Sequence, residues 1–464
     1  DESAEATATP TPGFAIPAPI DGGYVGTTTC LGCHNGTAAA DRTSFMKSGH
    51  PYKYTHTGGL AMGPTTLPGL HTRPLTASTD LDTLTLDNLL VSDGSGSLDW
   101  SAVNYVVGGF GWKIRWGIKD TLMTGGSTST GYIWTGNKAQ FNIRDGSWSA
   151  YNANTDKKYD CAKCHNTNGI ISTSGYSCWT DGGTDAAPAR TQPWGKNSGM
   201  GPQTHGGYYS SWTYDGVQCE ACHGPGATHS NSGTATQGKL TMPDGVTEIC
   251  AKCHIRSTNT TGQGGECDGT DNEAILTNGA IASGDWISHH EQYNELHGLN
   301  GDGVHNARKC TDCHDPHQRS TKVVDSVATL LSITDNSLSA EARGAIKVSC
   351  TSCHAGKTSA SSGSGMTGLA CIDCHMAEAT KSASSKPTTG WGRRGDVKTH
   401  IFKISTSPTA TNILRTNADG KIVATNYLTV KYTCGKCHDS VAGGTAHQMT
   451  EADALSWATG YHSR

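Results

Sequence analysis

The chain of 464 residues contains the motif Cys-x-x-Cys-His eight times, and these motifs use 16 of its 18 cysteines. Two thiols followed at once by an imidazole form the attachment signature of c-type haem: the thiols bond to the vinyl groups and the imidazole binds the iron. A zinc site is the alternative for a lone Cys-x-x-Cys pair, but zinc does not require the histidine every time. The motifs are Cys30, Cys33 and His34; Cys161, Cys164 and His165; Cys219, Cys222 and His223; Cys250, Cys253 and His254; Cys310, Cys313 and His314; Cys350, Cys353 and His354; Cys371, Cys374 and His375; and Cys434, Cys437 and His438.

The eight motifs predict eight covalent c-type haems, and this number limits the fold. Dividing 464 residues among eight haems leaves 58 residues for each, of which only 34% are hydrophobic, and glycine alone supplies 59 residues. Because so short a chain cannot surround each macrocycle with an apolar core, the haems themselves must form the core. We therefore expect a multihaem c-type cytochrome of sparse secondary structure, with mostly loops, short α-helices and a small β-hairpin region around a haem stack.

The chain divides into a short arm and one large unit. Residues 1–22 are rich in Pro, Ala and Thr and predict an extended arm. Residues 23–464 predict a single elongated octahaem unit, because the motif spacing has no fixed period. Within this unit, β-type residues flank the turn signal Asp145-Gly146 and predict a β-rich insert at about 100–152. We expect its tryptophans to pack and not to relay electrons: Trp112, Trp116, Trp134 and Trp148.

Two short helices have recognisable start signals. Ser337 and Glu341 predict a helix that runs into the sixth motif. Thr450 and Asp453 predict a second helix near the C-terminus by the same capping pattern.

The charge and the first residues indicate an exported protein. A net charge of −5 excludes a basic nucleic-acid interface, and no apolar stretch has the length of a membrane span. The chain begins at Asp1 in a polar tail, which predicts a mature protein whose signal peptide has been removed. Because haem is attached to cysteine outside the cytoplasm, we expect an extracellular or cell-surface location.

Two further features are open to two interpretations each. Cys178 and Cys267 lie outside the motifs, and in an oxidising compartment we favour a mutual disulfide over two free thiols. The stretch CDGTDNE at 267–273 offers carboxylates to a Ca²⁺ ion, but an acidic solvated loop is the favoured interpretation.

The supply of histidines decides what the irons can do, since an iron with two imidazoles only passes electrons. Of the 21 histidines, subtracting the eight in the motifs leaves 13, enough for eight distal ligands. His229 follows His223 by six residues, which reach about 20 Å at most, so we expect it to bind the iron of a neighbouring haem. The same argument applies to His317, three residues beyond His314. Methionine, the other common axial ligand, shows no comparable pattern.

Several stretches resemble known multihaem cytochromes. YDCAKCHNTNG, GVQCEACHGPGATH, CAKCHIR, HHEQYNEL and CTDCHDPH are similar to the relatives of the tetrahaem partner of hydroxylamine oxidoreductase. SGHPYKY, YVVGGFGWKIRW and TGNKAQFN resemble the filament-forming extracellular cytochromes, or cytochrome nanowires, of metal-reducing bacteria. The resemblance runs from about Tyr24 to about His317, and DVKTHIFKI near the end resembles the closing segment of many multihaem cytochromes.

The resemblance implies a set of distal ligands, supplemented by spacing. It supports His50, His229, His290, His317 and His400, while spacing alone adds His205, His305 and His462. His297 and His447 compete for these places, and His289 is the alternative to His290. In such filaments one junction haem takes its distal histidine from the next copy of the chain. His50, His56 or His71, near the N-terminus, is the candidate for that role here.

The favoured function is electron conduction, and the main alternative is catalysis. A conduit would carry electrons over long distances outside the cell, through eight bis-histidine haems, as part of anaerobic respiration. It would be assembled from copies of this chain joined head to tail in a filament. Its acceptors would be other cytochromes, metal oxides or electrodes. The alternatives are an octahaem oxidoreductase of the hydroxylamine oxidoreductase, nitrite reductase or tetrathionate reductase type, and a monomeric periplasmic shuttle. Because the histidines exceed the number required, we expect no enzyme and no catalytic residue.

Overall fold

The fold comes from a computed structural model, which describes a little under half of the chain. The described residues are 24–35, 45, 48–51, 53–56, 103–108, 113–119, 130–142, 147–152, 157–159, 161–167, 170–173, 208–211, 214–231, 246–251, 253–255, 280, 282–297, 305–317, 348–357, 366, 369–385, 390–418, 420–439 and 447–463. The cysteines and the histidine of all eight motifs lie within these residues.

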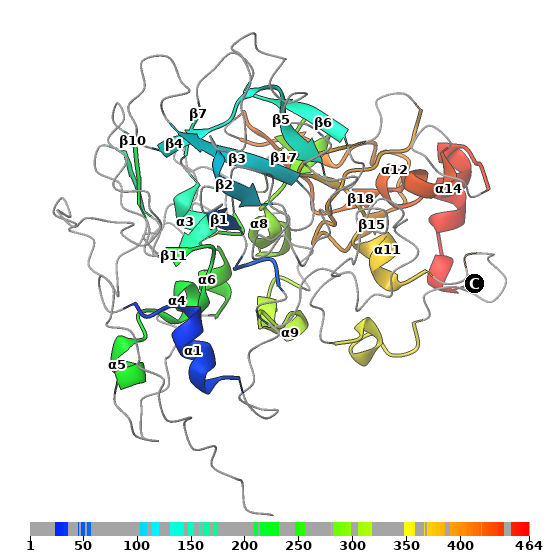
Figure 1. Ribbon diagram of the computed structural model, residues 1–464. Coiled ribbons are helices and arrows are strands. Elements are labelled where there is room, and N and C mark those ends of the chain that lie inside the picture. The colour runs from blue at the N-terminus through cyan, green and yellow to red at the C-terminus, as the bar shows by residue number, and fades with distance from the viewer. Residues whose placement is uncertain are drawn as a thin grey trace, which may run out of the picture.

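Helices in the described residues are short, and most of them belong to a motif (Figure 1). They are α1 (Thr27–Cys33), α3 (Ala162–His165), α4 (Cys219–His223), α5 (Ala227–Asn231), α6 (Val246–Ala251), α8 (Gln292–His297), α9 (Cys310–Cys313), α11 (Cys371–His375), α12 (Val430–Thr433), α13 (Gly435–His438) and α14 (Glu451–Ala458). Short 3₁₀ turns cover Cys350–Ser352 and Tyr461–Ser463.

The strands are also short, except in one sheet. They are β1 (Tyr54–His56), β2 (Val103–Gly108), β3 (Lys113–Lys119), β4 (Thr130–Ile133), β5 (Gly136–Asn142), β6 (Ser147–Tyr151), β7 (Lys157–Lys158), β8 (Asn166–Thr167), β9 (Ile170–Thr173), β10 (Tyr208–Ser211), β11 (Tyr214–Asp215), β12 (Ala282–Ser283), β13 (Trp286–Ser288), β14 (Thr380–Lys381), β15 (Ile404–Ser405), β16 (Leu414–Thr416), β17 (Ile422–Ala424) and β18 (Leu428–Thr429).

The largest sheet has seven strands, five of which fall between residues 103 and 151, where the β-rich insert is expected. Its strands follow the order β1-β2-β3-β4-β7, and β5 pairs with both β3 and β6. β5 and β6, which flank Asp145-Gly146, pair antiparallel with Asn142 opposite Ser147. The turn itself lies outside the described residues.

Aromatic rings pack on this sheet. Tyr54 stacks between Tyr105 and Tyr159, with ring centroids 4.4 and 4.3 Å away. The Trp116 side chain is 1% exposed and stacks on Trp148 at 5.4 Å. These rings contribute to packing, because stacked aromatic rings bury large apolar areas. Trp112 is outside the described residues.

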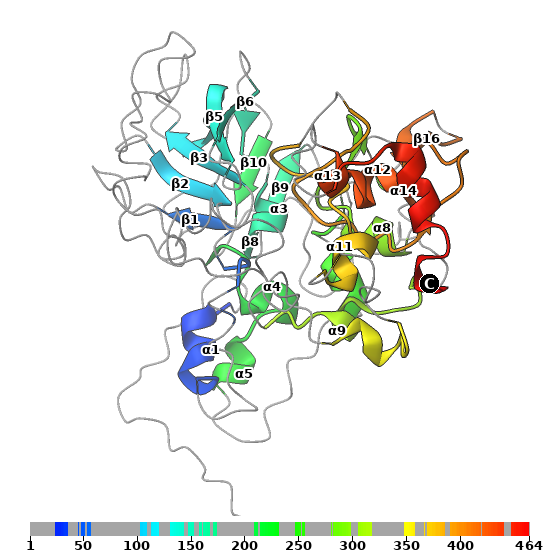
Figure 2. The same cartoon turned by 90° about the vertical axis from the view of Figure 1, so that its right-hand side faces the viewer.

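A second apolar core joins the C-terminal part of the chain to residues 280–288. It contains Trp286, Ile287, Ile401, Ile413 and Leu428. β13 pairs in parallel with β14, and β15 in parallel with β18, so segments about 25 to 90 residues apart in sequence meet in this core. Figures 1 and 2 place α12 and α14 on one side of the molecule and α1 on the opposite side.

One of the two predicted helices is confirmed and the other is corrected at its end. α14 begins after Thr450, whose hydroxyl accepts from the Asp453 amide, while the Asp453 carboxylate accepts from Thr450 in return. The helix predicted to run into the sixth motif does not do so: Ser349 is extended, and its hydroxyl accepts from the Thr351 amide to begin a separate 3₁₀ turn. The residues before 348 in that prediction lie outside the described part, as do 1–22, Cys178 and the whole of 267–273.

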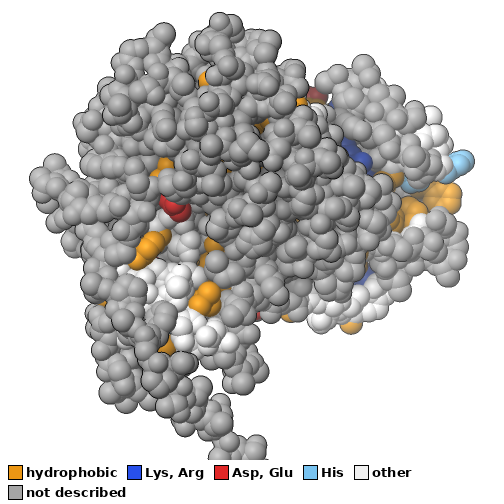
Figure 3. All heavy atoms as spheres, in the orientation of Figure 1, with side chains coloured by type: hydrophobic (Ala, Val, Ile, Leu, Met, Phe, Trp, Pro, Cys, Tyr) orange, Lys and Arg blue, Asp and Glu red, His pale blue; other side chains and the backbone are white. Residues whose placement is uncertain are grey.

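The described surface offers no membrane helix and no large patch of one charge on the face seen. In the described ranges no helix is long and apolar enough to cross a membrane. In Figure 3 the charged side chains of the described residues lie singly over the visible face.

Ile287 and Ile422 provide a matched test of the C-terminal core. Ile287 is fully buried and Ile422 is 56% exposed. We expect Ile287→Ala to lower the free energy of unfolding by about 2–5 kcal/mol, because it removes buried methyl groups and leaves a cavity. Ile422→Ala should change it by less than about 0.5 kcal/mol. Guanidinium chloride unfolding of the haem-loaded protein measures both, and equal losses would contradict this core.

Candidate haem sites

Each motif forms one helical turn, which brings its two cysteines and its histidine to one face. In six motifs the histidine amide donates to the carbonyl of the first cysteine at 2.9–3.0 Å. The other two histidines, His223 and His375, end helices α4 and α11. Residues at i, i+3 and i+4 share one side of a helical turn. None of the 16 motif cysteines forms a disulfide within the described residues, so both sulfurs of every motif are available for a haem.

The motif histidines lie opposite other histidines in the described residues. Five motif histidines each face one distal candidate, with ring centroids 5.8–6.5 Å apart: His34 with His229, His223 with His317, His314 with His400, His354 with His305, and His375 with His462. The sequence separation between partners ranges from 49 residues for His305 and His354 to 195 for His34 and His229.

A group of four histidines accounts for two further motifs. The His254 ring lies 6.3 Å from His50 and 6.2 Å from His290, and the His290 ring is also 6.5 Å from His165. Within this group His50 meets His254 alone and His165 meets His290 alone. A one-to-one assignment therefore pairs His50 with His254 and His165 with His290.

These separations fit an iron between two imidazoles. A metal ion about 2 Å from each of two opposite ring nitrogens places the centroids about 6 Å apart. The Nε2 atoms of His375 and His462 are 3.5 Å apart, close to the roughly 4 Å that such an ion requires. In the described part of the chain no group of three or more His, Cys, Asp or Glu side chains is arranged to hold a metal ion. The residues fit c-type haem with two histidine ligands.

Several of the imidazoles are oriented through Nδ1, which leaves Nε2 for the iron. His375 Nδ1 donates to the Phe402 carbonyl at 2.8 Å, and His254 Nδ1 donates to Gln292 Oε1 at 3.2 Å. The Phe402 ring also stacks on His305 at 4.4 Å. Nothing in the motif spacing identifies Gln292 or Phe402 in these roles, because the contacts form only in the folded chain.

Burial favours the neutral form of three of these imidazoles, which is the form that iron ligation requires. It lowers the pKa of His50 to about 3, and the neighbouring His254 and Lys53 add to the effect. It likewise lowers the pKa of His165 to about 3 and that of His290 well below its usual value. His290 also has a positive φ of 65°, a conformation that costs energy in a non-glycine residue.

His438 differs from the other motif histidines. Its Nδ1 donates to the His447 carbonyl at 2.5 Å. No second histidine ring lies against it among the residues that the structure describes. His447, a competitor for a distal place, thus approaches His438 through its backbone, and its side chain is exposed.

The remaining candidates do not face a motif histidine as closely. His289 Nε2 accepts from the Lys113 ammonium at 3.3 Å, and His297 Nδ1 donates to the Asn306 carbonyl at 2.7 Å. His205 and His71 lie outside the described residues, and only the backbone of His56 is described.

Thiols of different motifs meet in three places. Side-chain hydrogen bonds join Cys30 to Cys219 and Cys250 to Cys310, and a third contact joins Cys350 to Cys371. α1 packs on α4, and α6 packs on α9. The haems bound at each of these motif pairs would be held close to each other.

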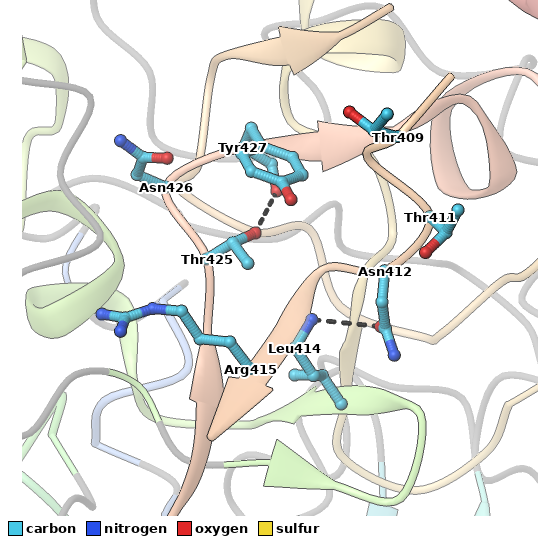
Figure 4. A pocket seen from close by; sticks show the side chains of 8 residues that line it. All are labelled: Thr409, Thr411, Asn412, Leu414, Arg415, Thr425, Asn426 and Tyr427. Atoms are coloured by element: carbon cyan, nitrogen blue, oxygen red, sulfur yellow. Dashed lines mark hydrogen bonds between the residues drawn. The ribbon is translucent and has the colours of Figure 1, made fainter. Parts of the chain in front are cut away.

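The described residues also form a polar groove, which is separate from the motifs (Figure 4). Its lining residues are Thr409, Thr411, Asn412, Leu414, Arg415, Thr425, Asn426 and Tyr427. None of them is a cysteine or histidine, so the groove has no part in haem attachment.

Comparisons with known proteins find two solved structures with a weak likeness to this chain. No family model and no curated protein matches this chain. The undecaheme cytochrome from the S-layer of Carboxydothermus ferrireducens is similar with a TM-score of 0.39 and 18% identity, over 96% of this chain and 60% of that one. The outer cell wall cytochrome OcwA is similar with a TM-score of 0.45 and 16% identity, over 93% of this chain and 85% of that one. Both likenesses are too distant to establish a shared fold, so the haem assignment rests on the motifs and the histidine pairs.

His462 and His447 provide a matched pair for testing these assignments. We expect His462→Ala to remove the ligand opposite His375 and to convert one low-spin haem to high spin. His447→Ala should leave all spin states unchanged, because alanine keeps the carbonyl that accepts from His438. Low-temperature EPR of the oxidised proteins measures both, and a high-spin signal only in His447→Ala would reverse the assignment.

Proposed function

We propose that this chain is an extracellular multihaem c-type cytochrome that conducts electrons through eight haems and catalyses no reaction on a substrate. The observation that carries the proposal is the histidine pairing: seven of the eight motif histidines face a second imidazole. When bound, the haems supply one-electron chemistry at iron. Two imidazoles on each iron leave no position for a substrate, and such ligation favours low potentials.

Short segments that serve two sites support a continuous path. His229 lies six residues after His223, and His317 lies three residues after His314, so each segment contributes to two histidine pairs. The three thiol contacts bring further motifs together. The first and last motifs lie on opposite sides of the molecule, on α1 and α13 (Figure 2). Electrons entering at one side would thus leave at the other, toward another cytochrome, a metal oxide or an electrode.

The proposal extends to a filament of head-to-tail copies. The ring of His438 would need a distal ligand: His205, the eighth distal candidate, lies outside the described residues, and a neighbouring copy is a second source. Because His50 lies against His254 within the chain, His56 and His71 are the remaining N-terminal candidates. A head-to-tail contact between unlike surfaces does not close, so it would extend into a fibre.

His438 is also the observation that favours the alternative function. An iron held by His438 alone would have an open position, as an octahaem oxidoreductase requires. Hydroxylamine, nitrite and tetrathionate are the substrates to assay. A monomeric periplasmic shuttle is the other alternative, and cell fractionation distinguishes it from a surface protein.

The first test counts spin states in the native protein. We expect eight haems per chain and only low-spin EPR signals in the oxidised filament, with no turnover of hydroxylamine, nitrite or tetrathionate. A stoichiometric high-spin signal together with turnover would replace the conduit with the oxidoreductase.

The second test concerns assembly. We expect negative-stain microscopy of the native protein to show filaments. A His56→Ala, His71→Ala double variant should give shorter or dispersed particles and one high-spin haem per chain. Dispersed particles from the native protein would argue against the filament, and the conduction proposal would then rest on the spin count alone.

A further inference from the structure

Glu220, inside the third motif, is a buried carboxylate with three backbone donors from elsewhere in the chain. Its side chain is 2% exposed. Oε1 accepts from the Val25 amide at 2.9 Å and from the Gly226 amide at 2.7 Å. Oε2 accepts from the Gly26 amide at 2.7 Å and from Val25 at 3.1 Å. Burial raises the pKa of Glu220, and the three backbone donors oppose that change.

Other carboxylates inside motifs cap their own helices. The Asp312 carboxylate accepts from the Lys309 amide at 3.0 Å. The Asp373 carboxylate accepts from the Ala370 amide at 2.8 Å and also from the Lys398 ammonium, 25 residues away, at 3.3 Å. Glu220 instead reaches a segment 194 residues away in sequence. Its hydrogen bonds therefore join separate parts of the fold.

The donors belong to the two segments that carry His34 and His229, the proposed ligands of the iron at the first motif. Val25 and Gly26 immediately precede α1, which carries the first motif and ends next to His34. Gly226 immediately precedes α5, which carries His229. One carboxylate thus connects the start of the segment with the proximal ligand to the start of the segment with the distal ligand.

Further contacts hold the start of α1 against the third motif. The Thr27 hydroxyl lies 3.2 Å from the Cys219 sulfur and accepts from the Cys219 amide. Gly26 has a φ of 81°, and a Cβ there would lie 2.9 Å from the Tyr214 ring. Figures 1 and 2 both place α1 beside α4 and α5. The start of α1 is thus closely packed against the third motif. The position of α1 therefore depends on Glu220, which binds the two backbone amides immediately before the helix.

We propose that Glu220 is a positioning residue that holds the first and third motifs in contact and holds His229 opposite His34. This inference rests on the proposed haem ligation. Its function would be to fix the geometry of one haem pair at the α1 side of the conduit through three backbone amides.

The test compares Glu220→Ala and Glu220→Gln with Asp312→Asn. Glutamine keeps the size and one accepting oxygen but turns an NH₂ donor toward backbone donors, whereas Asp312 is the exposed, locally capping control. Haem content is measured first, and EPR and carbon monoxide binding to the reduced protein follow. Potentiometric titration then gives the ratio of reduced to oxidised haem at each potential.

We expect both Glu220 variants to keep eight haems, and one haem in Glu220→Ala to become high spin or to bind carbon monoxide. The reduced-to-oxidised ratio of that haem should change about tenfold at a fixed potential, which is ~59 mV for one electron. Asp312→Asn should match the native protein. If Glu220→Ala does not fold, Glu220→Gln carries the test, with the same haem affected in part.

Native spin states and potentials in both Glu220 variants, even with reduced thermal stability, would overturn the positioning role, because a purely structural residue would behave in that way. A high-spin first haem already present in the native protein would instead overturn the proposed ligation itself. The two failures are therefore distinguishable.

Discussion

Pairs of histidines from distant parts of the chain are the constraint on which the rest of this structure depends. His34 and His229 are 195 residues apart in sequence, yet their rings lie 6.5 Å apart and nearly parallel. An iron between two such imidazoles would act as a crosslink that replaces part of the missing apolar core. The short helices and loops between the motifs then need only to present each imidazole at the correct distance.

Ordinary packing and hydrogen bonds complete what the histidine pairs begin. The aromatic stack on the seven-stranded sheet and the C-terminal core around Ile287 are conventional apolar clusters. Outside these clusters, polar groups fix the positions of individual ligands. The Phe402 carbonyl orients His375, and the Glu220 carboxylate joins the segments before α1 and α5. Buried polar groups stabilise the fold only when each of their hydrogen bonds is made, because an unpaired one costs the free energy of its desolvation.

The distinction between conduction and catalysis depends on a single coordination position. Seven motif histidines already face an imidazole, and this arrangement suits electron transfer, because an iron with both axial positions filled changes little on reduction. At His438, a distal ligand from His205 or from a neighbouring copy would fill the second axial position, whereas an open position would admit a substrate. The place of His438 on α13, on the opposite side of the molecule from α1, is also where a conduit would meet its next partner.

The sequence by itself determined the local chemistry: eight motifs, their one-turn geometry, and the α14 cap at Thr450 and Asp453. Each depends on residues within four positions of one another, which short-range sterics and hydrogen bonds control. It also named seven of the histidines that now face a motif histidine, but it assigned none of them to a particular motif. Only the tertiary structure decided that His50 meets His254, that His290 rather than His289 approaches His165, and that Glu220 reaches Val25 and Gly26. Those contacts join residues 125 to 204 positions apart, and a pattern of residue types carries no information about distances across a folded chain.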